Sequence, residues 1–218
     1  MAEPELLTRE EDGAELAVAV WRLPTPLLAL SSAPYGGGWG VRNWILAAQV
    51  AGGYGRLDPA AHLADLAGGL ALRGPGIGML TAVDVRQVRI SREGGIEVAA
   101  TVGLSHPTWA AAPDSAQGTA MGAAAGGAGT VNIVAVLDRR LSPAALVNAV
   151  MTVTEAKSQA LWDAGYPGTG TASDAVAVLC ATAGPEEAFA GPRSPVGARL
   201  ARAVHRAVLD GSPSAGDP

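Results

Sequence analysis

Three short apolar segments without charged residues constrain the fold of this chain more than any other feature. They are Ile77–Ala82, Thr130–Leu137 and Ala175–Ala181. Uninterrupted apolar runs of this length are typical of strands that are buried on both faces. Segments with helical spacing lie between them. This alternation predicts an α+β fold, with a single domain in which a mixed β-sheet is packed by helices and carries Gly-rich loops.

Three segments carry the signals of a helix start. Ser142–Pro143 combines an N-capping serine with a proline suited to the first helical position, and this helix is predicted to end near Ala164. Ser194–Pro195 opens a final amphipathic helix, and Asp58–Pro59 opens another. Val41–Val50 fits a helix or a strand, because its periodicity favours neither.

Two further pairs of strands are predicted. Ala14–Trp21 and Leu27–Ser32 are expected to flank a turn at Leu23–Pro26, which contains two prolines. Val85–Ile90 and Ile96–Leu104 are expected to form a hairpin with one exposed face, because apolar and polar residues alternate in the first of them.

Composition sets the expected limits of the folded part. Residues 1–13 are acidic and are predicted to be frayed, and the tail 211–218 is predicted to be disordered. Residues 14–210 are expected to form the single domain. Within it, the Gly- and Ala-rich segment 108–129 is predicted to be a flexible loop, either an active-site lid or a disordered insertion, because it is too long for an ordinary connection.

Charge and cysteine content exclude several classes of protein. The 218 residues carry a formal net charge of −5, which gives the chain no general affinity for nucleic acid or for an acidic membrane. A single cysteine, Cys180, cannot form a disulfide framework or a thiolate metal site. No run approaches the ~18 apolar residues of a membrane span, and the acidic N-terminus does not resemble a signal peptide. The expected location is therefore the cytoplasm.

Lys157 is the single lysine among 15 Lys and Arg residues. It lies on the apolar stripe of the predicted long helix, four residues after Val153 and four before Leu161. An ammonium on a buried face must be paired or must lose its proton. Two interpretations stay open. The side chain reaches water past the helix edge, or it points into a polar pocket, where it orients a carboxylate, stabilises an oxyanion or acts as a base.

The loop Gly168–Asp174 places three hydroxyl groups and a carboxylate directly before a predicted buried strand. Its glycines allow backbone N–H groups to point inward, where they can bind an anion or an amide oxygen. The loop is not a P-loop, because it lacks the Gly-Lys-Ser/Thr ending and leads into a strand. A carboxylate at this position is costly unless it is paired, and Lys157 is a plausible partner for Asp174.

Isolated polar residues near the ends of predicted strands have an ambiguous role. Satisfying a neighbouring backbone group is the more usual explanation for each of them. They are Asn43, Thr81, Thr101 and Asn132. The three histidines show no spacing typical of zinc ligands, so no protein-bound metal is predicted.

Six short motifs between Ser31 and Leu209, taken in order, resemble the adenosylcobinamide amidohydrolase family. They are Ser31–Gly38, Gly78–Ala82, Ala100–Ser105, Gly129–Ile133, Thr154–Lys157 and Gly170–Ala175. Members of this family are bacterial and archaeal enzymes of corrinoid salvage. The resemblance implies hydrolysis of the amide that joins the aminopropanol arm to the corrin ring of adenosylcobinamide, with adenosylcobyric acid as product. It implies no protein-bound cofactor, because cobalt arrives with the corrinoid substrate.

The resemblance also implies roles for residues inside these motifs. Asp174 is expected to act as a general base on water or on the hydroxyl of Ser173 or Thr171. Lys157 would hold this carboxylate ionised or protonate the leaving amine. Asn132 and loop N–H groups would stabilise the oxyanion. The residues expected to bind substrate are Gly36, Gly37, Gly38, Asn43, Thr81, Thr101, Thr130, Glu155 and Thr171.

Three features depart from the family pattern. Ala47–Ala48 stands where an asparagine often precedes Gln-Val, Ser173 replaces the commoner threonine, and segment 108–129 is longer than expected. The alternatives are therefore a diverged homologue, recruited to a natural-product pathway as a different enzyme or as a partner subunit, and a corrinoid-binding module without catalysis. The apolar composition and low charge make a homodimer, or a heterodimer with a relative, a further expectation.

Overall fold

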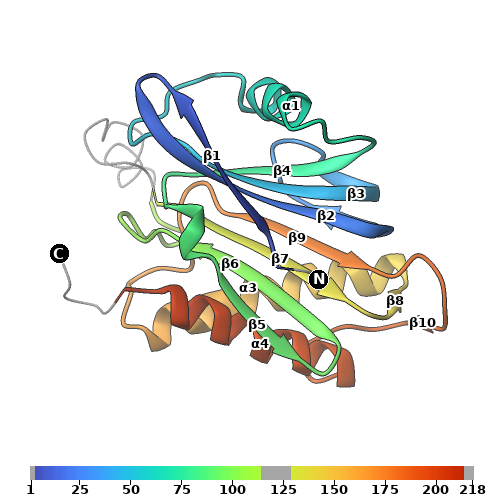
Figure 1. The fold of residues 1–218 in the computed structure, drawn as a ribbon. Coiled ribbons are helices and arrows are strands. Elements are labelled where there is room, and N and C mark those ends of the chain that lie inside the picture. Colours follow the sequence, from blue (N-terminus) through green and yellow to red (C-terminus); the bar gives the residue numbers. More distant parts are fainter. Residues whose placement is uncertain (1–2, 114–128, 214–218) are drawn as a thin grey trace.

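Eight strands form one mixed sheet, and helices cover parts of it (Figure 1). This computed structural model describes residues 3–113 and 129–213. The strands of the sheet are β1 (Glu5–Glu11), β2 (Ala14–Ser31), β3 (Gly38–Gln49), β4 (Gly76–Thr81), β5 (Arg89–Glu93), β6 (Ile96–Val102), β7 (Val131–Leu137) and β9 (Ala175–Cys180). The other elements of the described part are α1 (Pro59–Gly69), α3 (Pro143–Asp163), α4 (Pro195–Gly211), the 3-10 turn η1 (Val85–Gln87), and a small ribbon of β8 (Arg140–Leu141) and β10 (Glu186–Glu187).

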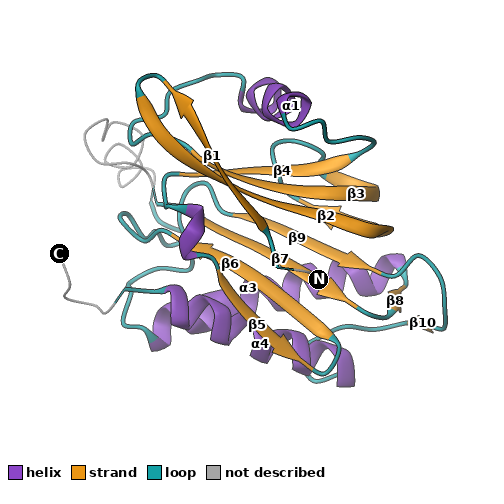
Figure 2. Ribbon diagram, viewed as in Figure 1, coloured by secondary structure: helices purple, strands orange, loops and turns teal. Residues whose placement is uncertain are grey.

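The strand order across the sheet is β4-β3-β2-β9-β7-β6-β5, and β1 pairs with β2 outside this path. β7 and β9 are parallel neighbours, whereas β6 and β7 are antiparallel, so the sheet is mixed. Figure 2 shows α3 and α4 running along the part of the sheet formed by β9, β7, β6 and β5. The predicted α+β fold is confirmed.

Two hydrophobic cores lie on opposite sides of β7, because successive side chains of a strand point to opposite faces. On one side, Ile133 packs with Val153 of α3 and Leu200 of α4. On the other side, Val134 packs with side chains of β2, β3 and β4, among them Ile45. Adjacent residues of β7 therefore pack into different hydrophobic cores.

β2 is one strand of 18 residues, so the turn predicted at Leu23–Pro26 was wrong. Its pairing with β3 shifts register between Arg22 and Leu27, and the two prolines lie in that interval. Proline has no N–H to donate to a ladder, but its fixed φ is compatible with an extended backbone. The prolines therefore interrupt the pairing without reversing the chain. The N-terminal part of β2 pairs with β1, and its C-terminal part pairs with β9.

Residues 5–11 form β1, so the frayed segment predicted over residues 1–13 was wrong for them. Asp12 and Gly13 have φ values of 52° and 78°, as the two central residues of a tight hairpin turn require. Asp-Gly is a strong hairpin signal, which the acidic composition obscured. Alternate residues of β1 stay exposed, and this exposure explains why the segment has the composition of a solvated tail.

The predicted helix starts are confirmed. α3 begins directly after Ser142, whose Oγ accepts a hydrogen bond from the N–H of Ala145 at 3.0 Å. α4 begins in the same way after Ser194. α1 begins after Asp58, although this carboxylate makes no capping hydrogen bond. The segment that fitted either a helix or a strand lies in β3, and the hairpin predicted over residues 85–104 forms β5 and β6 after the short turn η1.

Two predicted flexible segments fall largely beyond the described residues. Of the predicted loop 108–129, residues 114–128 lie outside the described part. At its start, Thr108 forms a bridge with Gly170. Of the predicted tail 211–218, Gly211 is the last residue of α4, and residues 214–218 lie outside the described part.

Glu11 joins β1 to the end of β3 and to α1. Its carboxylate accepts a hydrogen bond from Arg9 at 2.7 Å and lies 3.1 Å from His62 Nε2, while Arg9 also donates to the carbonyl of Gln49 at 2.7 Å. The hydroxyl of Tyr54 lies 3.0 Å from His62 Nδ1. Burial raises the pKa of Glu11, but the hydrogen bonds and charges of Arg9 and His62 outweigh it and hold this pKa below its usual value.

Replacing Glu11 with Gln is expected to lower the free energy of unfolding at pH 7 by about 1 kcal/mol, because hydrogen bonds to a charged group are lost. A depressed folded-state pKa adds stability that is fully present above the usual glutamate pKa, and this stability is lost as the pH falls through the lower, folded-state pKa. The difference between variant and wild type should therefore shrink towards about pH 3. Urea unfolding at both pH values measures it.

The matched control is Glu10→Gln, at an exposed position of the same strand. It should unfold like the wild type at both pH values. Equal losses of stability in the two variants at pH 7 would contradict the role assigned to Glu11.

Candidate functional site

Asp174 lies immediately before β9 and accepts hydrogen bonds from three different segments of the chain. Lys157 Nζ, from α3, contacts Oδ2. The N–H of Thr171 donates to Oδ2 at 3.1 Å, and Thr171 Oγ1 donates to Oδ1 at 2.6 Å. The N–H of Val131, at the start of β7, also donates to Oδ1, at 2.9 Å. A carboxylate has about four lone-pair sites, so these four donors fill the acceptor positions of Asp174.

Lys157 is 6% exposed, and its partner is the predicted one, Asp174. The sequence left two interpretations open for Lys157. The structure agrees with the second one, in which the ammonium points inward and pairs with a carboxylate. Either charge alone would be costly at this depth, so the pair ties α3 to the start of β9. Gly170 makes room for the pair, because a Cβ at this position would collide with both Asp174 Oδ2 and Lys157 Nζ.

The glycines of the loop before Asp174 allow two backbone segments to approach closely. The N–H of Thr108 donates to the carbonyl of Gly170, and the N–H of Thr169 donates to the carbonyl of Thr108, both at 2.8 Å. A Cβ at Gly168 would lie 2.8 Å from the carbonyl oxygen of Thr108. The loop that holds Thr171 and Asp174 is thus fixed from two sides, by α3 and by the segment around Thr108.

Ser173 and Thr130 form a second pair of hydroxyl groups beside Asp174. Their oxygens are 2.7 Å apart, and Ser173 Oγ also donates to the carbonyl of Gly129 at 3.3 Å. Ser173 is exposed, whereas Thr130 is buried. Among the described residues, Thr171 is the one whose hydroxyl donates to the Asp174 carboxylate.

Asn132 follows Val131 in β7, and its side chain points to the other side of the strand, towards β4. Its Nδ2 donates to the carbonyl of Leu80 at 2.8 Å. Its Oδ1 and the Oγ1 of Thr101, the neighbouring residue on β6, are buried and have no hydrogen-bond partner among the described residues. The Asn132 atom without any partner in the described part of the chain is therefore the acceptor Oδ1, and Nδ2 carries a second N–H beside the one that binds Leu80.

Three other predicted substrate-binding residues have no described contact with Asp174. Thr81 is buried at the end of β4, and its Oγ1 accepts a hydrogen bond from the N–H of Val83 at 3.1 Å. The side chain of Asn43 lies against Gly74, between α1 and β4. Glu155 lies on the exposed face of α3.

The glycine loop predicted to bind the substrate is tightly packed at two positions. A Cβ at Gly36, where φ is +65°, would collide with the backbone of Gly76, and a Cβ at Gly37 would lie 2.5 Å from the carbonyl oxygen of Ala33. At Gly38, where φ is +78°, no atom lies within 4 Å of the Cβ position. Close backbone packing therefore explains why positions 36 and 37 are glycine, and the positive φ explains the glycine at position 38.

Arg42 lies beside this loop and was not predicted from the sequence. It is 7% exposed, and its guanidinium donates to the carbonyls of Gly36, Gly37 and Val41. The available signal was a basic residue in a largely apolar segment, the same signal that identified Lys157.

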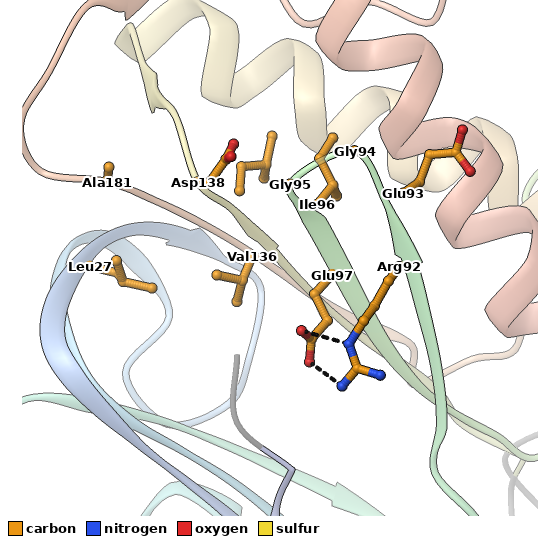
Figure 3. A pocket seen from close by; sticks show the side chains of 11 residues that line it. Leu27, Arg92, Glu93, Gly94, Gly95, Ile96, Glu97, Val136, Asp138 and Ala181 are labelled. Atoms are coloured by element: carbon orange, nitrogen blue, oxygen red, sulfur yellow. Dashed lines mark hydrogen bonds and ion pairs between the residues drawn. The ribbon is translucent and has the colours of Figure 1, made fainter.

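A pocket of about 540 Å³ lies at the other end of β7 and β9 (Figure 3). Leu27 and Val136 form apolar walls, and Arg92 pairs there with Glu97 at 3.1 Å. β9 is six residues long, and a strand rises about 3.3 Å per residue, so this pocket lies roughly 20 Å from Asp174. It is separate from the site around Asp174.

Metal ligands do not gather in the described part of the chain, where no three His, Cys, Asp or Glu side chains are grouped as such a site needs. Two of the histidines contact carboxylates instead: His62 contacts Glu11, and His205 Nε2 lies 2.7 Å from Asp163. No helix over residues 3–113 and 129–213 is long and apolar enough to cross a membrane.

Replacing Gly170 with Ala is expected to lower the free energy of unfolding by about 1–3 kcal/mol, because the new Cβ must displace Lys157 or Asp174. Urea unfolding measures the change. Gly68→Ala in α1 is the control, since no atom lies within 4 Å of its Cβ position and alanine favours a helix. A Gly170→Ala protein as stable as the wild type would show that the ion pair does not depend on this glycine.

Two curated relatives named "Adenosylcobinamide amidohydrolase" each match 144 residues. The protein of Halobacterium salinarum is 44% identical over 65% of this chain and 61% of its own length. The protein of Methanosarcina mazei is 32% identical over 62% of this chain and 65% of its own length. This chain therefore matches less than two thirds of either relative, both of which are archaeal.

Among solved structures, the PH0078 protein from Pyrococcus horikoshii OT3 aligns with 96% of this chain and 82% of its own, at 12% identity and a TM-score of 0.47. This structural similarity is too low to support a family assignment. A family model described as adenosylcobinamide amidohydrolase matches residues 3–215, which include all six motifs and the Asp174 site. The chain belongs to the adenosylcobinamide amidohydrolase family.

Proposed function

We propose that this chain hydrolyses the amide bond between the aminopropanol arm and the corrin ring of adenosylcobinamide, with adenosylcobyric acid as product. Membership of the family supports the reaction class. The hydrogen bond from Thr171 Oγ1 to Asp174 Oδ1, at 2.6 Å, is the observation that carries the chemistry. The substrate is a small corrinoid molecule, and its cobalt is part of the substrate.

A hydroxyl that donates to an oriented carboxylate is the arrangement of an activated nucleophile. Thr171 Oγ1 attacks the amide carbon, and its proton passes to Asp174. This proton then moves to the nitrogen as the C–N bond breaks, and aminopropanol leaves. Water attacks the resulting Thr171 ester and gives a proton to Asp174, which returns it to Thr171 Oγ1 as the carboxylic acid departs.

Lys157 is a positioning residue in this scheme. It contacts Asp174 Oδ2, whereas the Thr171 hydroxyl donates to Oδ1. Holding Oδ2 fixes the rotation of the carboxylate, so that Oδ1 stays directed at the hydroxyl. The N–H of Val131 supports the same orientation from β7.

Two other predicted catalytic residues fit less well. Asn132 donates one N–H of Nδ2 to the carbonyl of Leu80, and its side chain is directed towards β4, on the side of β7 opposite α3. Ser173 pairs with Thr130 instead of Asp174. The departure at Ala47–Ala48 lies in β3, where both side chains are buried in hydrophobic cores.

Thr171→Ala is expected to lower kcat by about 10³-fold or more, as removal of a nucleophile does in comparable hydrolases. Ser173→Ala, the matched control in the same loop, should stay within a few-fold of the wild type. Mass spectrometry of adenosylcobinamide turnover measures both. Full activity of Thr171→Ala together with loss in Ser173→Ala would reverse the two roles.

The same assay tests the activity itself. A wild-type protein that changes the visible absorbance of adenosylcobinamide but releases no aminopropanol would be a corrinoid-binding module. A protein that neither binds nor hydrolyses it would favour the diverged homologue with another substrate.

Lys157→Met is expected to abolish detectable turnover, because the Asp174 carboxylate loses its orientation and is left buried without a counter-charge. Circular dichroism and urea unfolding check that the variant is folded, and Lys157→Arg tests whether a positive charge alone is sufficient. Wild-type kcat in a folded Lys157→Met protein would refute the positioning role.

A further inference from the structure

Trp109 lies in the segment that follows β6, and its side chain is 47% exposed. A single exposed hydrophobic residue is common on protein surfaces and indicates nothing by itself. The surroundings of Trp109 give its exposure a meaning. The residues on either side of it are hydrogen-bonded to the loop that carries Thr171 and Asp174.

The hydroxyl of Thr169, in that loop, holds both peptide groups that flank Trp109. Its Oγ1 accepts a hydrogen bond from the N–H of Ala110 at 3.0 Å and donates to the carbonyl of Thr108 at 3.5 Å. The N–H of Thr169 donates to the same carbonyl at 2.8 Å. The carbonyl of Trp109 accepts from the N–H of Ala112 at 3.1 Å. The backbone of Trp109 is therefore held on both sides.

The long helix α3 holds Thr169 in turn. Ser158 Oγ, in this helix, donates to the carbonyl of Thr169 at 3.1 Å. Lys157, the preceding residue of the helix, pairs with Asp174. One short stretch of α3 therefore positions both the carboxylate of the site and the residue that holds Trp109.

Trp109 and the proposed nucleophile belong to one small region of the surface. Thr169 precedes Thr171 by two residues, so their Cα atoms are at most about 7 Å apart. The peptide groups on both sides of Trp109 contact Thr169. A corrin is a large macrocycle, so a corrinoid whose amide lies at Thr171 must cover neighbouring parts of this surface.

We propose that Trp109 is a substrate-binding residue whose indole packs against a flat conjugated ring of the corrinoid when the amide lies at Thr171. Tryptophan provides a large aromatic surface, and few side-chain torsions must be ordered when it binds. Both the corrin ring and the adenine of the adenosyl group offer a suitable face. This inference rests on the proposed function, and it assigns a contact to a part of the substrate away from the reacting amide.

The direct test is equilibrium dialysis with adenosylcobyric acid, a probe that lacks the scissile amide and is not turned over. Trp109→Ala should raise Kd by about tenfold, a loss typical of one aromatic stacking contact. Trp109→Phe should stay within about threefold of the wild type, because an aromatic face remains. Trp39→Ala is the matched control, since Trp39 is 51% exposed and lies in β3, and its Kd should not change. Circular dichroism checks that each variant is folded.

A second probe identifies the ring that packs on Trp109. Dicyanocobyric acid has the corrin ring but no adenine. An equal loss of affinity for both probes in Trp109→Ala would show that the indole packs on the corrin. A loss confined to adenosylcobyric acid would show that it packs on the adenine.

Kinetics separate substrate binding from a general loss of structure. Trp109→Ala should raise KM for adenosylcobinamide by about tenfold, with kcat changed less than about threefold. Thr169→Val, which keeps the shape of the side chain but removes the hydroxyl, should raise KM by a smaller factor. The double variant should have the KM of Trp109→Ala, because the Thr169 hydroxyl acts through the tryptophan.

The outcomes distinguish this inference from the proposed function. A folded Trp109→Ala protein that binds both probes as tightly as the wild type, or that turns over with an unchanged KM, would overturn the role of Trp109. Weaker binding of a probe in Trp109→Ala, in a wild type that releases no aminopropanol, would support this role and defeat the proposed hydrolysis. A wild type that neither binds the probes nor hydrolyses adenosylcobinamide would overturn both.

Discussion

The buried ion pair between Lys157 and Asp174 is the interaction on which the rest of the site depends. It joins a helix, a loop and the starts of two parallel strands, because Asp174 also accepts from Thr171 and Val131. Neither charge is tolerable at that depth without the other. The packing of α3 and the conformation of the loop before β9 therefore depend on each other. Together they orient the Thr171 hydroxyl.

Local signals were sufficient for the parts of the fold that local chemistry determines. Ser142 and its proline marked the start of α3, and an ammonium on an apolar stripe identified Lys157 and its need for a partner. The prolines at Leu23–Pro26 were misleading, because pairing with distant strands keeps β2 extended through them. For β1, the acidic composition outweighed an Asp-Gly turn signal that was present in the sequence.

The orientation of side chains that depend on long-range contacts could not be predicted. Asn132 was assigned as an oxyanion donor by residue type, but the strand period turns it towards Leu80 of β4, on the side opposite α3. Gly36 and Gly37 were assigned to substrate access, whereas the backbones of Gly76 and Ala33 require them. Only the assembled sheet brings those backbones close.

The position of β9 in the sheet has a consequence for how the chain reaches its native state. β9 comes late in the sequence but lies between β2 and β7, so it connects the early strands to the later ones. Until residues 175–180 leave the ribosome, β2 and β7 each lack a neighbour and expose an unpaired edge. Contacts this distant in sequence are slow to form. During synthesis the nascent chain is therefore most exposed to aggregation between the completion of β7 and the arrival of β9. Asp174, which directly precedes β9 and completes the site, emerges at the end of this interval.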